Sequence, residues 1–301
     1  MVVNPVAAGG RSLRRWRRLE PALVAGFPDL IVRLTERAGH GELVARAWAE
    51  EHPGGTLLAC GGDGTIHEVA NGWWQAGGTG RFGVIATGSG NDFARNAGLP
   101  GNPAEAVRQL SSGSVRPCDV GRVSFRAPDG TPQARIFLNS LSLGVSVRAN
   151  RFAQALTPIR PSRLRYALGA LGALWTPEQT SYLLRDEQGA LWNDRALNLT
   201  VANGATFGGG MPISPGSSLR DGVLDLVVLR PLRGFRAVQA LSRLQRGTHV
   251  ALPEVSITAL RGALTIATDR PDWRAEADGQ ELAGTGELVV QVLAGALPLL
   301  A

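Results

Sequence analysis

Three glycine-rich turns in the N-terminal third of the chain each follow a short apolar run and precede a helical pattern. They are Asn4-Pro5-Val6-Ala7-Ala8-Gly9-Gly10, Cys60-Gly61-Gly62-Asp63-Gly64-Thr65 and Gly88-Ser89-Gly90-Asn91-Asp92. A strand that turns directly into a helix is the repeating unit of a parallel βαβ sheet. The carboxyl ends of parallel strands meet at one edge, where open α/β sheets bind ligands. We therefore expect the three turns to converge on one site.

The pattern of apolar residues changes near residue 115. Before it, short apolar runs alternate with helical segments, which indicates a parallel α/β domain. After it, short β-type runs such as Ala134–Ser142 and Glu287–Val292 are separated by Pro, Gly, Asn and Asp, as in a β-sandwich. Helical patterns interrupt these runs at Pro161–Trp175 and Gly234–Arg246.

We therefore predict two domains. An α/β nucleotide-binding domain spans residues 1–115, and residues 293–301 could complete it. A β-sandwich domain spans residues 116–292. No secretory signal and no apolar run of about 20 residues is visible, so we expect a chain without a membrane span. Cys60 and Cys118 lie in apolar runs without metal-ligand spacing, which predicts two reduced core thiols.

All 31 basic residues of the chain are arginine, and the net charge is +6. The absence of lysine excludes the P-loop, the protein-kinase fold and Schiff-base chemistry, each of which requires a lysine amine. A phosphate site in this chain must use backbone amides, helix N-termini, metal ions and arginine. We expect the positive charge to act at an acidic membrane surface rather than on nucleic acid.

Two readings remain open for the turns that contain Asp63 and Asp92. The glycines around Asp63 would let the backbone approach a polyanion, and a Mg²⁺ ion would make the carboxylate compatible with phosphate. Thr65 could then cap the next helix or bind a phosphate oxygen. Asp92 could be a plain helix cap or a second carboxylate for Mg²⁺. The alternative is that both turns only connect a strand to a helix; Phe93, where a third glycine would stand, excludes a dinucleotide fingerprint.

The motifs in this order resemble the catalytic domain of diacylglycerol kinases, and in particular the soluble bacterial lipid kinases of that superfamily, which also includes sphingosine and ceramide kinases. In the first domain the resemblance rests on the three turns, with Glu68-Val69, Asn71-Gly72 and Phe93-Ala94-Arg95. In the second domain it rests on Asn203-Gly204, Phe207-Gly208-Gly209-Gly210, Ile213-Ser214-Pro215, Asp221-Gly222-Val223-Leu224-Asp225 and Asp278-Gly279.

The resemblance implies an NAD kinase-like α/β domain that binds ATP and a β-sandwich domain that binds lipid, with ATP and lipid meeting in the cleft. The implied reaction is ATP-dependent phosphorylation of a lipid hydroxyl, with diacylglycerol as the first expectation and phosphatidic acid as its product. It further implies a cytoplasmic protein at the inner face of the membrane. The oligomeric state stays open, with a dimer as one option.

Carried over by position, the resemblance also implies roles for single residues. Asp278 would be the general base, and Asp63 and Asp92 would hold a catalytic Mg²⁺. A further Mg²⁺ would lie at Ser218, Asp221 and Val223. The residues implied to contact ATP are Asn4, Thr35, Gly61, Gly62, Asp63, Gly64, Thr65, Ile66, His67, Ser89 and Asn91.

Four positions depart from the family pattern. His67 replaces the usual asparagine, Ser89 replaces a threonine, and Ala86 replaces the proline that precedes it. Gln280 stands where the family has a glutamate after Asp278-Gly279, with Glu281 one place later. The substitution at Gln280 bears on the rate of the reaction more than on its type.

Two alternative functions remain open, and so do two interpretations of one helical pattern. An NAD kinase shares the Gly-Gly-Asp-Gly loop, and a module that binds nucleotide or anionic lipid without catalysis would fit Gln280. The helical pattern Pro161–Trp175 combines arginines at one end with Tyr166 and leucines. It could cover the sandwich as an amphipathic helix, or form a lip through which an acyl chain enters.

Overall fold

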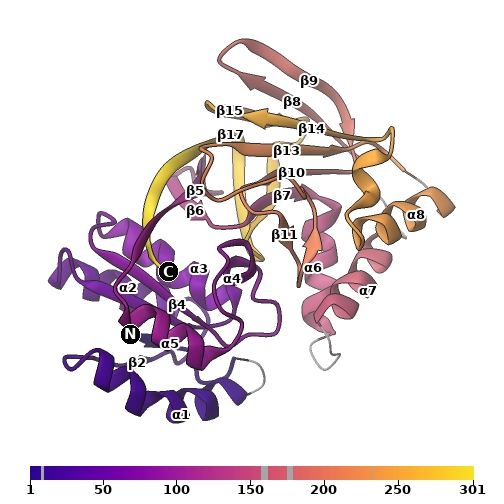
Figure 1. Cartoon of the computed structure of the whole chain (residues 1–301). Coiled ribbons are helices and arrows are strands. Elements are labelled where there is room, and N and C mark those ends of the chain that lie inside the picture. Colours follow the sequence, from indigo (N-terminus) through magenta and orange to yellow (C-terminus); the bar gives the residue numbers. More distant parts are fainter. Residues whose placement is uncertain (8–9, 157–161, 175–178, 233) are drawn as a thin grey trace. The chain divides into compact units, whose positions relative to one another are not determined.

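The computed structural model of the chain describes residues 1–7, 10–156, 162–174, 179–232 and 234–301 (Figure 1). The chain divides into two compact units. The first comprises Met1–Asp119 with Ala294–Ala301, and the second comprises Val120–Leu293. Gly9 of the first turn and the predicted helix ends Pro161 and Trp175 lie outside the described residues.

The first unit contains a parallel sheet with the strand order β2-β1-β3-β4-β17. Every neighbouring pair is parallel, including the last pair, in which Leu299 of β17 lies opposite Phe82 of β4. The strands are β1 (Val2–Val3), β2 (Arg33–Leu34), β3 (Thr56–Gly61), β4 (Arg81–Ala86) and the end of β17 (Gln280–Leu300).

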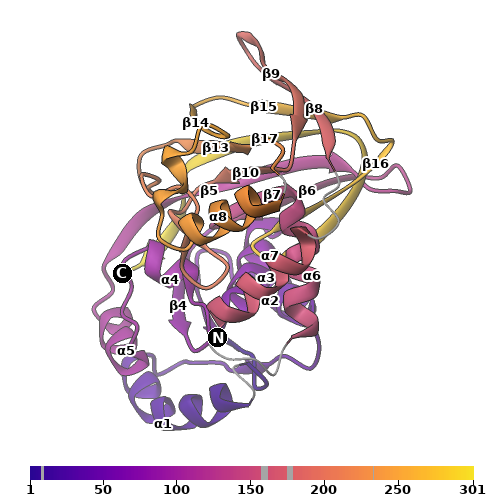
Figure 2. The ribbon, with the colours of Figure 1, turned by 90° about the vertical axis from the view of Figure 1, so that its right-hand side faces the viewer.

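Helices alternate with these strands, as the sequence predicts. They are α1 (Arg11–Gly26), α2 (His40–Glu51), α3 (Asp63–Gln75), α4 (Asp92–Asn96) and α5 (Pro103–Ser111). Figures 1 and 2 show α1 and α5 on one side of the sheet and α2 and α3 on the other. Gly72 lets α2 and α3 approach closely, because a Cβ there would lie 2.2 Å from the carbonyl oxygen of Glu42. The central strands β1, β3 and β4 are thus covered on both faces, which explains why they are apolar runs, whereas the edge strand β2 is exposed.

The second unit is a mainly antiparallel β structure. One run of neighbours is β14-β13-β10-β7-β16-β17, and β15, β8 and β9 continue from β17, while β5 pairs with β6 and β17. Its strands are β5 (Val115–Arg126), β6 (Pro132–Phe137), β7 (Ser140–Gly144), β8 (Thr180–Asp186), β9 (Gly189–Ala196), β10 (Asn198–Ala202), β13 (Leu224–Leu229), β14 (Val255–Leu260), β15 (Leu264–Thr268) and β16 (Asp272–Ala277). A separate ribbon joins β11 (Thr206–Phe207) to β12 (Met211–Pro212).

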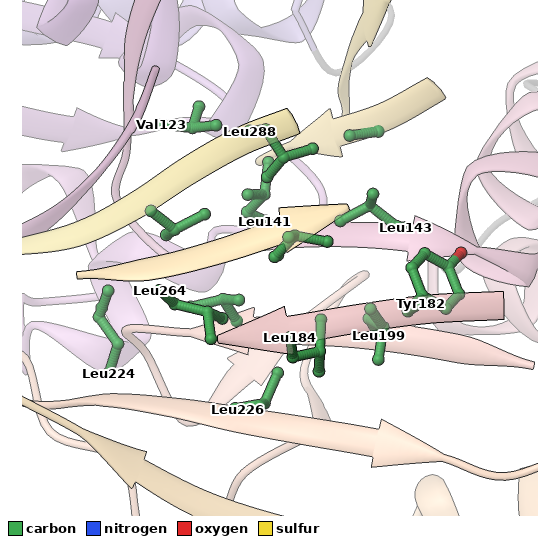
Figure 3. Packing of buried hydrophobic residues seen from close by; sticks show 14 of the residues in the cluster. Val123, Leu141, Leu143, Tyr182, Leu184, Leu199, Leu224, Leu226, Leu264 and Leu288 are labelled. Atoms are coloured by element: carbon green, nitrogen blue, oxygen red, sulfur yellow. The ribbon is translucent and has the colours of Figure 1, made fainter. Parts of the chain in front are cut away.

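Alternating apolar side chains form the core of the second unit. Leu141 and Leu143 of β7 pack with Leu199 of β10, Leu226 of β13 and Leu264 of β15 (Figure 3). Because side chains alternate along a strand, the opposite face of β7 carries serines that are also buried. This buried polar face lies next to helix α6 (Val145–Ala155), which packs on β7 and β16.

The helices of the second unit differ in part from the prediction. Helix α7 (Ser162–Leu174) and helix α8 (Gly234–Leu244) match the two helical patterns, but α6 was not predicted. Helix α6 is short, and polar residues alternate with apolar ones along it, so no clear helical pattern of apolar residues is visible in its sequence. Helix α7 packs closely on α6, because a Cβ at Gly169 would lie 2.4 Å from the carbonyl oxygen of Ala149.

Two predicted strands were wrong in their extent. The segment Ala134–Ser142 forms two strands, β6 and β7, instead of one. The chain breaks between them because the backbone N–H groups of residues 138–140 donate to the carboxylate of Asp278 and not to a neighbouring strand. Glu287–Val292 is the middle of β17, and the strands β9 and β16 were not predicted. Both cysteines are buried free thiols, as predicted. Among the described residues, no helix is long and apolar enough to cross a membrane.

Candidate functional site

The turns that follow β1, β3 and β4 lie together at the carboxyl edge of the first unit's sheet. The backbone N–H of Asn4 donates to the carbonyl of Cys60 at 3.0 Å, and that of Thr87 donates to the carbonyl of Gly61 at 2.8 Å. These bonds continue the sheet past the ends of its strands. The convergence of the three turns was predicted from the sequence, and it occurs at the edge where α/β sheets bind ligands.

Gly62 and Gly88 bring the second and third turns into backbone contact. A Cβ on Gly88 would lie 2.5 Å from the Cα of Gly62, closer than two carbon atoms can approach. Helix α3 begins directly after Gly62, and among the described residues no side chain caps this helix end. A helix start without a side-chain cap is the kind of end at which backbone N–H groups and the positive end of the helix dipole bind anions.

Thr65 does not cap α3, because the helix begins two residues before it, at Asp63. Instead, the Thr65 hydroxyl oxygen accepts a hydrogen bond from Asn4 Nδ2 at 3.0 Å. The Asn4 Oδ1 atom accepts from the N–H groups of Val6 and Ala7 at 3.1 and 3.2 Å. Asn4 thus connects the first turn to the start of α3.

Asp63 and Asp92 are connected through the start of α4. Asp63 Oδ1 accepts from the backbone N–H of Phe93 at 3.1 Å. Asp92 pairs with Arg95 at 2.6 Å, and Arg95 also donates to the carbonyl of Gly90 at 2.9 Å. The helix cap at this position is Asn91 rather than Asp92, with a left-handed backbone (φ 56°).

The oxygen atoms at this edge suit a Mg²⁺ ion. Asn91 Oδ1 is buried and has no hydrogen-bond partner among the described residues. Asp92 directly follows it in the sequence, and Asp63 binds the backbone N–H of Phe93, the next residue. Mg²⁺ takes oxygen ligands and is usually bound by one or two carboxylates together with phosphate oxygens and water. Within the described part of the chain, no three His, Cys, Asp or Glu side chains group into a complete metal site.

The remaining predicted ATP contacts differ in position. Ser89 is exposed in the third turn, and Thr35 is buried directly after β2, with its N–H donating to the carbonyl of Val3 at 2.9 Å. The side chains of Ile66 and His67 are buried within the first unit. His67 Nε2 lies 3.2 Å from Asn71 Nδ2, so the ring contacts its own helix.

Three further residues of this edge were not predicted. The Ser12 and Thr87 hydroxyls form a buried hydrogen bond of 2.7 Å, and Arg15 donates to the carbonyl of Thr87 at 3.1 Å. Arg15 lies on α1 and is exposed, like Arg14, Arg17 and Arg18, so the local sequence pattern does not single it out for this edge.

The predicted second metal loop of Ser218, Asp221 and Val223 is a fixed turn in the second unit. Asp221 Oδ1 accepts from the N–H of Val223 at 3.1 Å. Asp225, which follows in β13, accepts from the hydroxyls of Ser214, at 3.0 Å, and Ser217. Ser218 and Asp221 are exposed. The loop offers one carboxylate, one hydroxyl and backbone carbonyls to a hard cation.

Asp278 lies in the turn between β16 and β17 and has a left-handed backbone (φ 49°). Its Oδ2 accepts from the N–H of Leu138 at 2.6 Å, and its Oδ1 accepts from those of Asn139 and Ser140 at 2.8 and 3.0 Å. Its own N–H donates to the carbonyl of Ser140 at 3.0 Å. These four bonds offset the cost of a left-handed residue other than glycine.

Glu281 does not take the place of the missing family glutamate beside Asp278. It forms a bidentate pair with Arg151 of α6, at 2.7 and 2.5 Å, and also binds Arg274 of β16. The hydrogen bonds from these arginines lower its pKa. Glu281 is therefore an ionised anchor between α6 and the β16–β17 hairpin.

Comparison with known proteins matches both units. Residues 1–123 match the diacylglycerol kinase catalytic domain, and residues 139–301 match the YegS C-terminal NAD kinase beta sandwich-like domain. A protein of Pseudomonas fluorescens named "probable lipid kinase YegS-like" is 32% identical over 81% of this chain and 79% of its own length. A protein of the same name from Stenotrophomonas maltophilia is 29% identical over 90% of this chain and 86% of its own length.

A solved structure with a similar fold is that of a diacylglycerol kinase from Bacillus anthracis. The two chains superpose with a TM-score of 0.70 at 22% identity, over 99% of this chain and 94% of the other. This similarity confirms the predicted fold class, an α/β parallel-sheet domain followed by a β-sandwich-like domain.

Proposed function

This chain belongs to the family that joins a diacylglycerol kinase catalytic domain to a YegS-type β-sandwich domain, and from that premise we propose that it is an ATP-dependent lipid kinase. The proposed substrate is the hydroxyl of a membrane lipid, first of all diacylglycerol, with phosphatidic acid as the product. In this proposal the first unit binds ATP and the second binds the lipid.

The observation that carries the proposal is the junction of Gly62 and Gly88 at the uncapped start of α3. Because the two turns meet at glycines, no side chain keeps a phosphate chain away from the backbone there. The start of the helix offers N–H donors to that phosphate chain. Asn4 and Thr65 hold this edge together, and Ser89 adds a hydroxyl. The site needs no lysine, in agreement with a chain that contains none.

A Mg²⁺ ion held by Asp63 and Asp92, with Asn91 Oδ1 nearby, would neutralise charge on the phosphates. The carboxylates themselves are kept in place by the start of α4 and by Arg95. A second Mg²⁺ at Ser218, Asp221 and Val223 is proposed on the same chemical ground of oxygen ligands.

Asp278 is proposed as the general base of the transfer. As the lipid hydroxyl oxygen forms its bond to the γ-phosphorus, the bond from that phosphorus to the leaving ADP oxygen breaks. The hydroxyl proton passes to the Asp278 carboxylate. The three backbone N–H groups that bind this carboxylate fix its orientation before the substrate arrives.

We also propose that α6, α7 and α8 touch the membrane. Leu164, Leu168 and Leu171 of α7 are exposed and follow a helical spacing, and α6 adds the exposed Phe152. Helix α8, which contacts α7, exposes Phe235 by 80%. Exposed apolar side chains on adjacent helices favour insertion between headgroups, which supports the lip hypothesis and a peripheral location at a membrane.

The test is a transfer assay with labelled ATP, a panel of lipids in vesicles and NAD as a competing acceptor. Labelled phospholipid supports the proposal, and labelled NADP would establish an NAD kinase instead. ATP binding without transfer to any acceptor would support the non-catalytic module.

A further inference from the structure

A second acidic side chain lies beside Asp278, buried in the second unit. Glu276 of β16 is only 7% exposed, and its Oε2 atom has no hydrogen-bond partner among the described residues. On β16 it pairs across to Ser142 of β7 and to Glu281 of β17. A carboxyl group in this position has lost its hydrogen bonds to water, and few hydrogen bonds within the protein replace them. This loss destabilises its charged form.

The charges that act on Glu276 are negative. They belong to Asp278 and Glu281, whereas the nearby arginines of α6 and β16, Arg151 and Arg274, are bound by Glu281. Burial, followed by these two carboxylates, raises the pKa of Glu276 to about 8, against the effect of a hydrogen bond with Asn150. Glu276 is therefore a neutral acid at pH 7.

Asn150 connects Glu276 to the turn that carries Asp278. It is a buried residue of α6, and its side chain hydrogen-bonds to Glu276 and donates from Nδ2 to the carbonyl of Gly279 at 2.9 Å. Gly279 directly follows Asp278 and has a positive φ of 83°. The left-handed pair Asp278-Gly279 is thus held on one side by the amides of residues 138–140 and on the other by Asn150.

We propose that Glu276 is a positioning residue for the proposed general base, acting through Asn150 on the Asp278-Gly279 turn. While Glu276 is neutral, Asn150 can bind the Gly279 carbonyl without a competing charge. When Glu276 ionises, its charge draws the Asn150 amide and repels the Asp278 carboxylate at low local dielectric. The turn then moves, so the inference predicts a loss of transfer activity on the alkaline side. The inference rests on the proposed function only for its kinetic readout.

The kinetic test compares the pH profile of kcat for lipid phosphorylation in the wild type and in Glu276→Gln. A single group with a pKa of about 8 leaves roughly a tenth of the wild-type sites neutral at pH 9, so the wild-type rate should fall about tenfold from its plateau. Glutamine cannot ionise, and its variant should carry its pH 7 rate through to pH 9. Glu287→Gln, at an exposed ion pair with Arg185, is the matched control and should keep the wild-type profile. An unchanged alkaline decline in Glu276→Gln would overturn the inference.

A spectroscopic test does not depend on kinase activity. The backbone amide resonances of Leu138, Asn139 and Ser140 report on the Asp278 carboxylate that they bind. In the wild type we expect them to titrate with a midpoint near pH 8, and in Glu276→Gln we expect no such step. In Asn150→Leu the step should become smaller, because only the direct repulsion between Glu276 and Asp278 remains. If the wild type phosphorylates no lipid but the step is present, the proposed function fails and the positioning role stands. If the step is absent from the wild type, the positioning role fails.

Discussion

Gly62 and Gly88, from turns after neighbouring strands, meet backbone to backbone with no room for a Cβ between them. We expect Gly88→Ala to separate the two turns, to lower the free energy of unfolding by about 1–3 kcal/mol, and to weaken ATP binding. Thermal unfolding and calorimetric titration with ATP would measure both effects. Gly101→Ala is the control, because a Cβ there meets nothing within 4 Å. Wild-type ATP affinity in Gly88→Ala would show that the junction does not shape the nucleotide site.

Replacement of Asp63 by asparagine tests the carboxylate at the start of α3. Asparagine retains an oxygen that can accept from the Phe93 amide, so the fold should persist. The negative charge that would hold Mg²⁺ is lost, and we expect kcat to fall at least about 100-fold, as for the loss of a major electrostatic contribution. Asp129→Asn, at an exposed turn, is the matched control. A rate within threefold of wild type in Asp63→Asn would remove Asp63 from the proposed mechanism.

Asp278→Asn tests the proposed general base. An asparagine can place one oxygen toward the amides of Leu138 to Ser140, but its NH₂ group cannot accept from them. We expect phosphorylation to be lost and the second unit to be destabilised, while ATP binding is retained. Equilibrium binding of ATP and a transfer assay on the same preparation separate these effects. Full activity would contradict the assignment.

The exposed leucines of α7 test the proposed membrane contact. Leu168→Asp combined with Leu171→Asp places two charges on the exposed face and should abolish binding to vesicles of anionic phospholipid, because a carboxylate is costly at the acyl boundary. Vesicle flotation measures the bound fraction. Leu43→Asp changes an exposed leucine of α2 in the same way and should not affect binding. Undiminished flotation of the double variant would refute the contact.

Glu276 also predicts a dependence of stability on pH. Its pKa is about 8 in the folded chain and near 4.5 when exposed, so the folded state binds more protons between these values. The free energy of unfolding should therefore fall as the pH rises from about 5 to 8. Glu276→Gln lacks this loss and should be more stable than wild type by roughly 2–4 kcal/mol at pH 8, with little difference at pH 5. Denaturant unfolding at both pH values measures the difference. Equal stability at pH 8 would show that Glu276 is not buried as a neutral acid.

The first unit could be predicted closely because its information is local. A glycine-rich turn between an apolar run and a helical pattern specifies both elements that it joins, and three such turns specify a parallel sheet and its binding edge. Details of the edge were less accessible. Whether Thr65 caps α3 stayed open in the sequence, because the pattern of apolar residues does not show that the helix begins at Asp63, and the orphaned oxygen of Asn91 depends on a left-handed backbone.

The second unit was predicted in class but not in detail. Strand β16 carries charged residues that hide its alternation, and α6 has a weak apolar pattern, so neither was predicted. The break between β6 and β7 follows from the amides that bind Asp278, about 140 residues further along the chain. Contacts over such separations leave no mark in a local pattern.

The amino-acid sequence alone determined that this chain builds a phosphate site without lysine, from glycine turns, helix ends and carboxylates. Residue types and short-range spacing are sufficient for that conclusion. Only the tertiary structure decided which carboxylates are ionised anchors and which is neutral. Glu276 and Glu281 lie in the same hairpin, yet one is buried beside negative charge and the other binds two arginines. Because the charge of a carboxyl group depends on its water and its neighbours, long-range packing determines it.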